Sequence, residues 1–297
     1  MGKARKRRMG DRRGDRRDGR RLRTLDPYNE LAPFIMKTRN DSNNYFSDTV
    51  DITEAERYLR GKRLHGYPGM GILHLFIASY IRVVTQYPAI NRFISGQRIY
   101  ARNGIEFIMT IKKEMRTDAS ETSVKITFDT HDTILDVYKK LNSEINRIKG
   151  EGEATDTDDV AKTLMKMPRL LLKFSIFFLG IFDYFGLLPQ ALINASPFHG
   201  SVIITDLGSI GMPSICHHLY NFGNLPVFIS LGAKRKTKEL RQDGAIIERK
   251  YIDYGVVLDE RICDGFYFSQ VLRLFRSILR NPYVLEEPPD TIIEDID

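Results

Sequence analysis

Hydrophobic and polar residues follow two different periods along this chain, so both strands and helices are expected. Residues 45–52 (YFSDTVDI) alternate between the two kinds and are rich in aromatic and β-branched side chains, which predicts a strand. Asn103-Gly104 falls between two other such runs, and this dipeptide predicts a tight hairpin there. The same signals predict further strands at residues 92–101, 105–113, 122–128, 201–205, 226–231 and 246–258.

Helices are predicted where apolar residues recur every three or four positions. Residues 70–87 are apolar almost all round, which indicates a buried helix. Residues 132–148 carry an apolar stripe, and residues 264–279 are amphipathic at the helical period. Thr53 and Glu56 have the spacing of a capping box, which predicts the start of a short helix.

The order of these elements favours one layered domain. Strands and helices alternate irregularly, with hairpins and without internal repeats. This pattern predicts an α/β fold of the layered α+β kind, in which helices pack on a mixed sheet. We expect residues 25–285 to form a single domain.

The positive charge of the chain is concentrated at its beginning. Residues 1–24 hold twelve Lys or Arg against three Asp, a net charge of +9, so the rest is near −2 within a total of +7. So polar a segment predicts a disordered basic arm, a candidate for contact with RNA, an anionic membrane or an acidic partner. Residues 26–39 contain two prolines and are expected to be irregular, and residues 286–297 to be a frayed acidic tail.

The most apolar stretch, residues 170–193, is interrupted by Lys173, Asp183 and a proline. Its uncharged runs are shorter than the roughly 20 residues that a membrane-spanning helix needs. We therefore expect a buried helix or a subunit interface here rather than membrane contact. The two cysteines, Cys216 and Cys263, make neither a disulfide framework nor a metal-type spacing, which favours a reducing cytoplasm.

Three blocks in the second half of the chain carry recognisable patterns. Residues 200–211 (GSVIITDLGSIG) contain a hydroxyl before a Leu-Gly turn, and residues 226–232 (PVFISLG) are a strand-like run. Asp264-Gly265 opens the last predicted helix, with three aromatic residues directly after it. In this order and spacing the blocks resemble the catalytic domain of the chloramphenicol acetyltransferase and 2-oxo acid dehydrogenase acyltransferase superfamily. In that family the last block reads His-x-x-x-Asp-Gly.

The resemblance implies a chloramphenicol acetyltransferase-like two-layer fold and acyl transfer between coenzyme A and a second nucleophile. In the family a histidine is the general base on a thiol or hydroxyl, and a nearby hydroxyl stabilises the tetrahedral oxyanion. Asp264 is implied to be structural and to pair with an arginine near the start of the domain. The family's sites lie between subunits, so a homotrimer is implied.

The chain departs from the family where the catalytic histidine should stand, because this residue is Glu260. A glutamate ordinarily has a pKa of about 4.3 and a thiol one of about 8.5, so glutamate is mismatched as a base by roughly four units. Burial in a dry channel would raise a carboxyl pKa and recover part of that difference. Glu260 is therefore either such a base or a surface residue of a site that has lost the reaction.

Other residues bear on the same chemistry. Thr205 stands at the oxyanion position, where the family usually has Ser, and it keeps the hydroxyl. Asp206 follows directly, and its charge would oppose an oxyanion unless it points away. His217 and His218 come after the oxyanion strand and are alternative bases, or else a loop or interface pair.

These observations leave three hypotheses. The first is a stand-alone, homotrimeric acyltransferase that uses acyl-coenzyme A as a substrate and a small-molecule acceptor. The second is a catalytically degenerate relative that serves binding or assembly, and position 260 distinguishes it from the first. The third is a trimeric carrier whose basic arms bind a polyanion. No lipoyl domain, metal-ligand spacing or phosphate-binding loop is recognisable, so we expect no metal.

Overall fold

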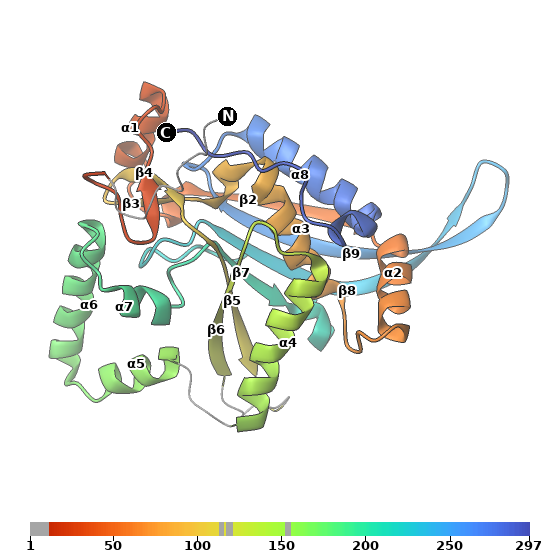
Figure 1. The fold of residues 1–297 in the computed structure, drawn as a ribbon, viewed down its shortest axis with the longest axis horizontal. Helices are drawn as coiled ribbons and strands as arrows, with labels where there is room; N and C mark the ends of the chain where they lie inside the picture. The colour runs from red at the N-terminus through yellow and green to blue at the C-terminus, as the bar shows by residue number, and fades with distance from the viewer. Residues whose placement is uncertain (1–11, 113–115, 117–120, 152–155) are drawn as a thin grey trace, which may run out of the picture.

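The computed structural model describes residues 12–112, 116, 121–151 and 156–297, and its centre is a six-stranded sheet (Figure 1). The strand order is β2-β9-β8-β7-β5-β6. β7 runs parallel to β5 and β8, and the other neighbours are antiparallel, so the sheet is mixed, as predicted. The strands are β2 (Asn43–Asp51), β5 (Ile105–Lys112), β6 (Glu121–Phe128), β7 (Val202–Asp206), β8 (Val227–Leu240) and β9 (Ile246–Asp259).

Helices cover one face of this sheet (Figure 1). They are α2 (Thr53–Leu64), α3 (Ile72–Gln86), α4 (Ile134–Glu151) and α8 (Gly265–Arg280). The main hydrophobic core lies between these helices and the sheet, and α3 packs against both α4 and α8. The predicted layered fold is confirmed, and so are the strands and helices expected in this part of the chain. The capping box predicted for α2 is wrong, because Ile52 is its N-cap and Thr53 accepts the N–H of Lys250 instead.

Side chains along each central strand alternate between the two faces of the sheet. In β7, Val202 and Ile204 are buried under the helices, whereas Ile203 points to the opposite face. There Ile203 packs beside Phe228 of β8 and Val257 of β9, in a small second cluster. This alternation of side chains decides which face of the sheet each candidate site residue occupies.

A second sheet has three strands in the order β1-β4-β3. They are β1 (Gly19–Arg21), β3 (Arg92–Ser95) and β4 (Arg98–Arg102). The predicted hairpin at Asn103-Gly104 is wrong, because β4 and β5 on either side of it belong to different sheets. The hairpin instead joins β3 and β4 through Gly96 and Gln97, whose φ angles of 54° and 56° suit a type I′ turn.

The prediction of a disordered arm is wrong for residues 12–24, and residues 1–11 lie outside the described residues. Leu22 is only 2 % exposed and joins the main core, and β1 adds a strand to the second sheet. Arg16 is 4 % exposed although it is charged. The segment is therefore an integral part of the domain.

Arg16 can be buried because one acid near it in the sequence and one far along the chain neutralise its charge. Its guanidinium pairs with Asp18 at 3.0 Å and with Asp183 at 2.6 Å, and it donates a hydrogen bond to Ser95 at 2.8 Å. Burial alone would raise the pKa of Asp183, but the hydrogen bonds and charges of His199 and Arg16 lower it to about 2. The network ties the N-terminal segment to β3 and to the end of a helix far along the chain.

The acidic tail docks on the N-terminal segment instead of fraying. Asp295 forms an ion pair with Arg92 at 2.6 Å, and Asp297 pairs with Arg12 at 2.7 Å. The carbonyl of Asp297 also accepts the backbone N–H groups of Arg23 and Thr24, both at 2.8 Å. The basic segment near the start of the chain and the acidic tail thus neutralise each other. The two segments are far apart in the sequence, so their contact could not be predicted from it.

Two further expectations are corrected. Residues 26–39 contain helix α1 (Pro27–Ile35), which Asp26 caps by accepting the N–H groups of Tyr28 and Asn29. The apolar stretch is not buried within the chain, because it forms the largely exposed helix α6 (Arg169–Tyr184), between α5 (Asp156–Met165) and α7 (Gln190–Ala195). Among the described residues, no helix combines the length and the apolar character required to cross a bilayer.

We predict that Arg16→Ala destabilises the domain by about 3–5 kcal/mol, because it leaves Asp18 and Asp183 buried without their counter-ion. Arg17→Ala, at an exposed position next to it, should change the stability by less than about 0.5 kcal/mol. Urea unfolding of both variants measures the difference. Equal stability of the two would show that the segment is not docked.

Candidate functional site

Thr205 lies near the end of β7, on the face of the sheet that the helices leave uncovered. Its neighbour Ile204 points into the helix-covered core, so the side chain of Thr205 points the other way. Thr205 is half-buried and pairs in register with Ser230 of β8, which in turn faces Gly255 of β9. The hydroxyl predicted to bind an oxyanion is thus presented on an open side of a rigid strand.

Asp206 does not point to the same side as Thr205. It pairs with Leu231, which is fully buried on the helix-covered face. Its carboxylate accepts the backbone N–H of Ser209 at 3.2 Å and so caps the short turn that follows β7. Burial raises the pKa of Asp206. The adjacent negative charge therefore does not oppose an oxyanion at Thr205.

The Leu207-Gly208 turn that follows β7 needs its glycine. A Cβ at Gly208 would lie 2.4 Å from the carbonyl oxygen of Gly232 in β8, so any side chain there would push the turn away. The close approach of the two backbones fixes the direction in which the chain leaves β7. The turn therefore keeps Thr205 at the end of a defined strand.

Glu260 lies directly after β9, in a turn that is held on both sides. Asp259 and Arg261 are buried and form a bidentate ion pair, with distances of 2.8 and 2.6 Å. Arg261 also donates to the carbonyl of Met36 at 2.7 Å, and the N–H of Glu260 donates to the carbonyl of Ser42 at 2.9 Å. The backbone at position 260 is therefore rigid.

The side chain of Glu260 is exposed and makes no hydrogen bond with the described part of the chain. Within one chain it is not in a dry channel. Asp264 is exposed as well, and its Oδ1 accepts the N–H of Tyr267 at 2.7 Å as the N-cap of α8, which begins at Gly265. Among the described residues Asp264 has no arginine partner, so the ion pair implied for it is wrong, and its structural role is a helix cap.

One chain does not bring Thr205 and Glu260 together. Thr205 lies in register with Ser230 and Gly255, and Glu260 follows Gly255 by five residues. At about 3.3–3.4 Å per residue this is ~17 Å along the strands, far beyond the ~3 Å needed for both to act on one reacting group. The two lie at different ends of the same sheet.

His217 and His218 lie over the same face of the sheet as Thr205. The ring of His217 stacks on Phe228 with a centroid distance of 4.2 Å, and His218 stacks on His217 at 4.6 Å. The Nδ1 atom of His217 lies 2.7 Å from the carbonyl of His218, which leaves Nε2 without a hydrogen bond in the described chain. Phe228 precedes Ser230 by two residues along β8. Because Ser230 pairs with Thr205, His217 lies between Thr205 and Glu260 along the strand direction.

Residues that were not singled out in the sequence hold the histidine segment in place. Ser230 contacts both the N–H and the carbonyl of Ile215 through its Oγ, at 3.1 and 2.7 Å. Beyond the histidines, the buried Arg39 donates to the carbonyls of Tyr220, Asn221 and Gly223. Burial lowers the pKa of Arg39 to about 10, so it remains charged at neutral pH. Arg39 was missed because its partners are over 180 residues away.

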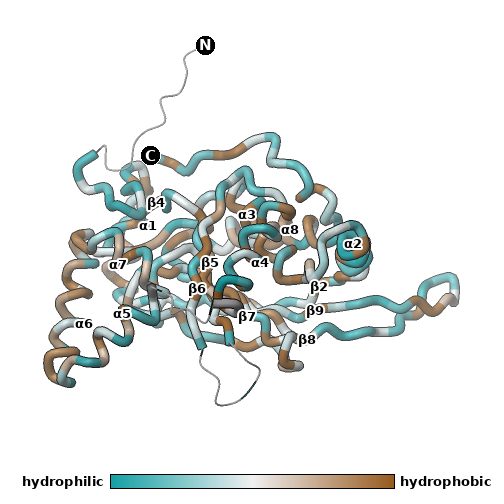
Figure 2. The backbone as a smooth tube through the Cα atoms, turned by 60° about the horizontal axis from the view of Figure 1, so that its bottom comes forward, coloured by the Kyte–Doolittle hydropathy of each residue, from teal (hydrophilic) through white to brown (hydrophobic). Residues whose placement is uncertain are grey.

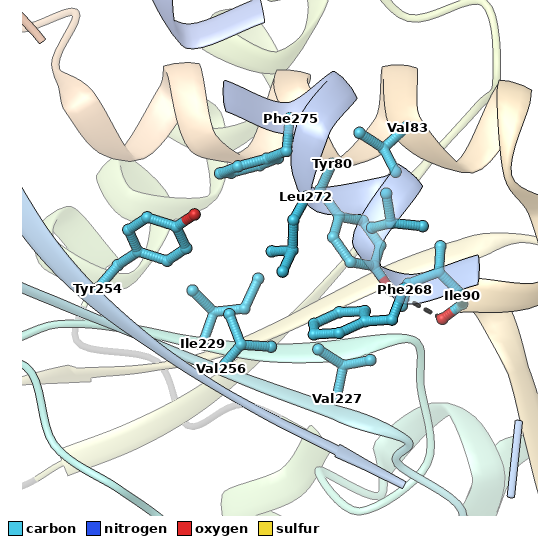
Figure 3. Close-up of a pocket in the computed structure, with 11 residues that line it drawn as sticks. Tyr80, Val83, Ile90, Val227, Ile229, Tyr254, Val256, Phe268, Leu272 and Phe275 are labelled. Atoms are coloured by element: carbon cyan, nitrogen blue, oxygen red, sulfur yellow. Dashed lines mark hydrogen bonds between the residues drawn. The ribbon is translucent and has the colours of Figure 1, made fainter. Parts of the chain in front are cut away.

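A cavity of about 30 Å³ lies elsewhere, between the sheet and helices α3 and α8 (Figure 3). Apolar side chains line it, with Tyr80 donating its hydroxyl to the carbonyl of Ile90 at 3.2 Å. This volume holds about one water molecule, so the cavity is a packing gap rather than a substrate site. In the described part of the chain, no group of three or more His, Cys, Asp or Glu residues is placed to hold a metal ion.

Comparison with known proteins rests on structure, because no protein-family model and no curated protein matches the chain. A probable dihydrolipoamide acetyltransferase from Listeria monocytogenes is 15% identical with a TM-score of 0.55, over 86% of this chain and 94% of that one. A truncated catalytic core of the 2-oxoacid dehydrogenase complex from Thermoplasma acidophilum is 12% identical, with a TM-score of 0.54 over 89% and 99%.

A third similar structure is dihydrolipoamide acetyltransferase from Azotobacter vinelandii, 10% identical with a TM-score of 0.56 over 87% of this chain and 88% of that one. It was studied for the roles of a serine, a histidine and an asparagine in catalysis. At these identities the likeness establishes the fold. The chain has the fold of these two dihydrolipoamide acetyltransferases and of the 2-oxoacid dehydrogenase catalytic core.

Proposed function

We propose that this chain is an acyltransferase that moves an acyl group from a coenzyme A thioester to a small thiol, hydroxyl or amine acceptor. The observation that carries the proposal is the presentation of the Thr205 hydroxyl at the end of β7, with the charge of Asp206 turned to the other face. On this face the hydroxyl can donate to an oxyanion without the carboxylate of Asp206 beside it.

The reaction uses the groups of this chain as follows. A base takes the proton of the acceptor, which attacks the thioester carbonyl carbon. The hydroxyl of Thr205 donates a hydrogen bond to the oxyanion of the tetrahedral intermediate. The intermediate collapses as the carbon–sulfur bond breaks, and the coenzyme A thiolate leaves and takes up a proton.

If Glu260 is the base, the site is complete only between copies of the chain in a homotrimer. The ~17 Å between the levels of Thr205 and Glu260 excludes their cooperation within one chain. The turn that carries Glu260 is tied to the end of α1, because Arg261 donates to Met36. α1 exposes Tyr28, Leu31, Phe34 and Ile35, an apolar surface suited to contact with a neighbouring copy. Such a contact would bring the Thr205 of one copy towards the Glu260 of another.

The base is either Glu260 or His217. A neighbouring copy over the Glu260 turn would exclude water from the carboxylate and make it a stronger base. His217 instead lies on the same face as Thr205 and offers a free Nε2 within one chain. The two assignments differ in whether the base and the oxyanion site belong to one copy or to two.

A second candidate function is binding or assembly without catalysis. The observation that favours it is the exposure of Glu260, which has no hydrogen-bond partner in the described part of the chain. In this case the rigid Asp259–Arg261 turn would serve only to close the fold. Assays at position 260 separate the two functions.

We predict a homotrimer at micromolar concentration, with three times the 34.3 kDa mass of the chain. The double change Phe34→Ser and Ile35→Ser should dissociate it, because it makes the exposed face of α1 polar. Sedimentation velocity or light scattering measures the mass. A wild-type monomer would contradict the composite site.

We predict that Thr205→Val lowers the turnover rate by about 10²–10³ without affecting the fold, because it removes only the hydroxyl that donates to the oxyanion. Thr110→Val is the matched control, since Thr110 is an exposed strand residue of the same sheet. The assay follows free thiol released from acetyl-coenzyme A with a panel of thiol, amine and hydroxyl acceptors. If both variants keep full activity, Thr205 is not the oxyanion donor.

We predict that Glu260→Gln lowers the rate by about 10² or more and that Glu260→His retains or raises it, because histidine restores a base with an ordinary pKa near 6.5. Glu248→Gln, on the β8–β9 hairpin, serves as the control. A silent Glu260→Gln combined with an inactive His217→Ala or His218→Ala assigns the base to the histidine segment. A wild type that is inert with every acceptor supports the binding function instead.

A further inference from the structure

Helix α6 presents its aromatic face to solvent, which is the reverse of an ordinary surface helix. Figure 2 shows α6 as an apolar segment at the edge of the molecule. Phe177 is 62 % exposed, and the residues around it on the helix are exposed as well. Ile176 apart, the exposed apolar residues of α6 lie within an arc of ~160° at about 100° per residue. They are Leu170, Leu171, Phe174, Phe177, Phe178, Phe182 and Tyr184.

The inward side of α6 holds apolar residues too, Leu172 and Leu179, which are half-buried. It carries Ser175 and the buried Asp183, whose ion pairs with Arg16 and His199 anchor the C-terminal end of the helix. Tyr184 adds a hydrogen bond from its hydroxyl to Gln97 at 2.8 Å. The orientation of α6 is therefore fixed by buried polar contacts, and its apolar side cannot turn inward without breaking them.

Positive charges flank the apolar face, and most of them have no acidic partner among the described residues. From residue 160 to residue 187 the chain has four cations, and its only acid is the buried Asp183. Lys162 has an acidic partner, Asp159, at 3.8 Å. Lys166, Arg169 and Lys173 are exposed and form no ion pair within the described residues. An apolar arc beside unpaired cations is the pattern of helices that lie in the interface of an anionic bilayer.

We propose that α6 binds the surface of a membrane that contains anionic lipids and lies in the plane of the interface. Its sixteen residues are about 24 Å long, less than the ~30 Å hydrocarbon core, so it lies along the surface. Phe174, Phe177 and Phe178 enter the boundary between headgroups and acyl chains, while Arg169 and Lys173 contact lipid phosphates. The sequence favoured a buried helix or a subunit interface for residues 170–193, and it did not reveal that the aromatic face is turned outward.

A second copy of the chain is a weaker occupant of this face. Two α6 helices packed on each other would give Arg169 and Lys173 no acidic partner, because the only acid of the helix is the buried Asp183. A bilayer supplies apolar depth and negative charge at the same time. The proposal is independent of the acyltransferase chemistry, because it uses no residue of the candidate site.

The absence of tryptophan from the chain provides a direct test. In the otherwise intact protein, Phe178→Trp places a single fluorophore on the exposed face of α6. With vesicles of phosphatidylcholine and phosphatidylglycerol (3:1), the emission should shift to the blue, and brominated acyl chains should quench it. With phosphatidylcholine alone both effects should be several-fold weaker, because the charge attraction is lost. Unchanged emission with both kinds of vesicle would overturn the proposal.

Vesicle sedimentation of unlabelled variants identifies the surface. Phe174→Ser, Phe177→Ser and Phe178→Ser together should weaken binding to the anionic vesicles by about tenfold or more. The matched control replaces three exposed apolar residues elsewhere by serine, Leu64, Leu240 and Ile246, and should bind as the wild type does. Equal loss in both variants would contradict a role of α6. If the α6 variant instead lowers the mass found by light scattering, a second copy covers this face and the proposal fails.

Discussion

The two-sided character of the central sheet is the constraint on which the candidate site depends. Residues at even positions of β7, such as Ile204, must point towards α3 and α8, because the core under these helices is closed. Thr205 is then forced onto the other face, and Asp206 back to the first. A shift of one residue in the register of β7 would exchange the hydroxyl for the carboxylate. The chemistry available at this position is thus fixed by core packing.

A buried ion network extends this order beyond the sheet. Arg16 brings the N-terminal segment, β3 and α6 together through Asp18, Ser95 and Asp183. Burying these charges is costly, and the network is stable only because each carboxylate has at least one cationic partner. Arg102 is buried beside it, stacked on Phe93 at 4.3 Å and bonded to Asn224. The network also sets the direction in which α6 faces, because the ion pair of Asp183 with Arg16 fixes the C-terminal end of the helix.

Much of the fold could be predicted from the sequence, because alternation and helical periodicity report on local burial. The strand β2 and the helices α3, α4 and α8 were found in this way. The hairpin at Asn103-Gly104 was not, because a local turn signal cannot tell whether the flanking strands share a sheet. The docking of Arg16 was missed for the same reason: Asp183 is 167 residues away. Thr205 and Glu260 were recognisable by motif, but their separation required the register of three strands.

Two exposed apolar surfaces remain on the domain, and their charges indicate different partners. α1 carries Asp26 and Glu30 at its beginning, and a cation, Lys37, follows it. A surface with both acids and a cation suits contact with another protein, which can supply opposite charges and hydrogen-bond partners. α6 has cations alone at its exposed edge, and a protein partner would have to provide acids at every contact. Glu260, a candidate base, lies in a turn tied to the end of α1 through Arg261 and Met36. A subunit contact at α1 would therefore bear on the proposed acyl transfer, whereas contact through α6 would place the protein where apolar molecules are concentrated.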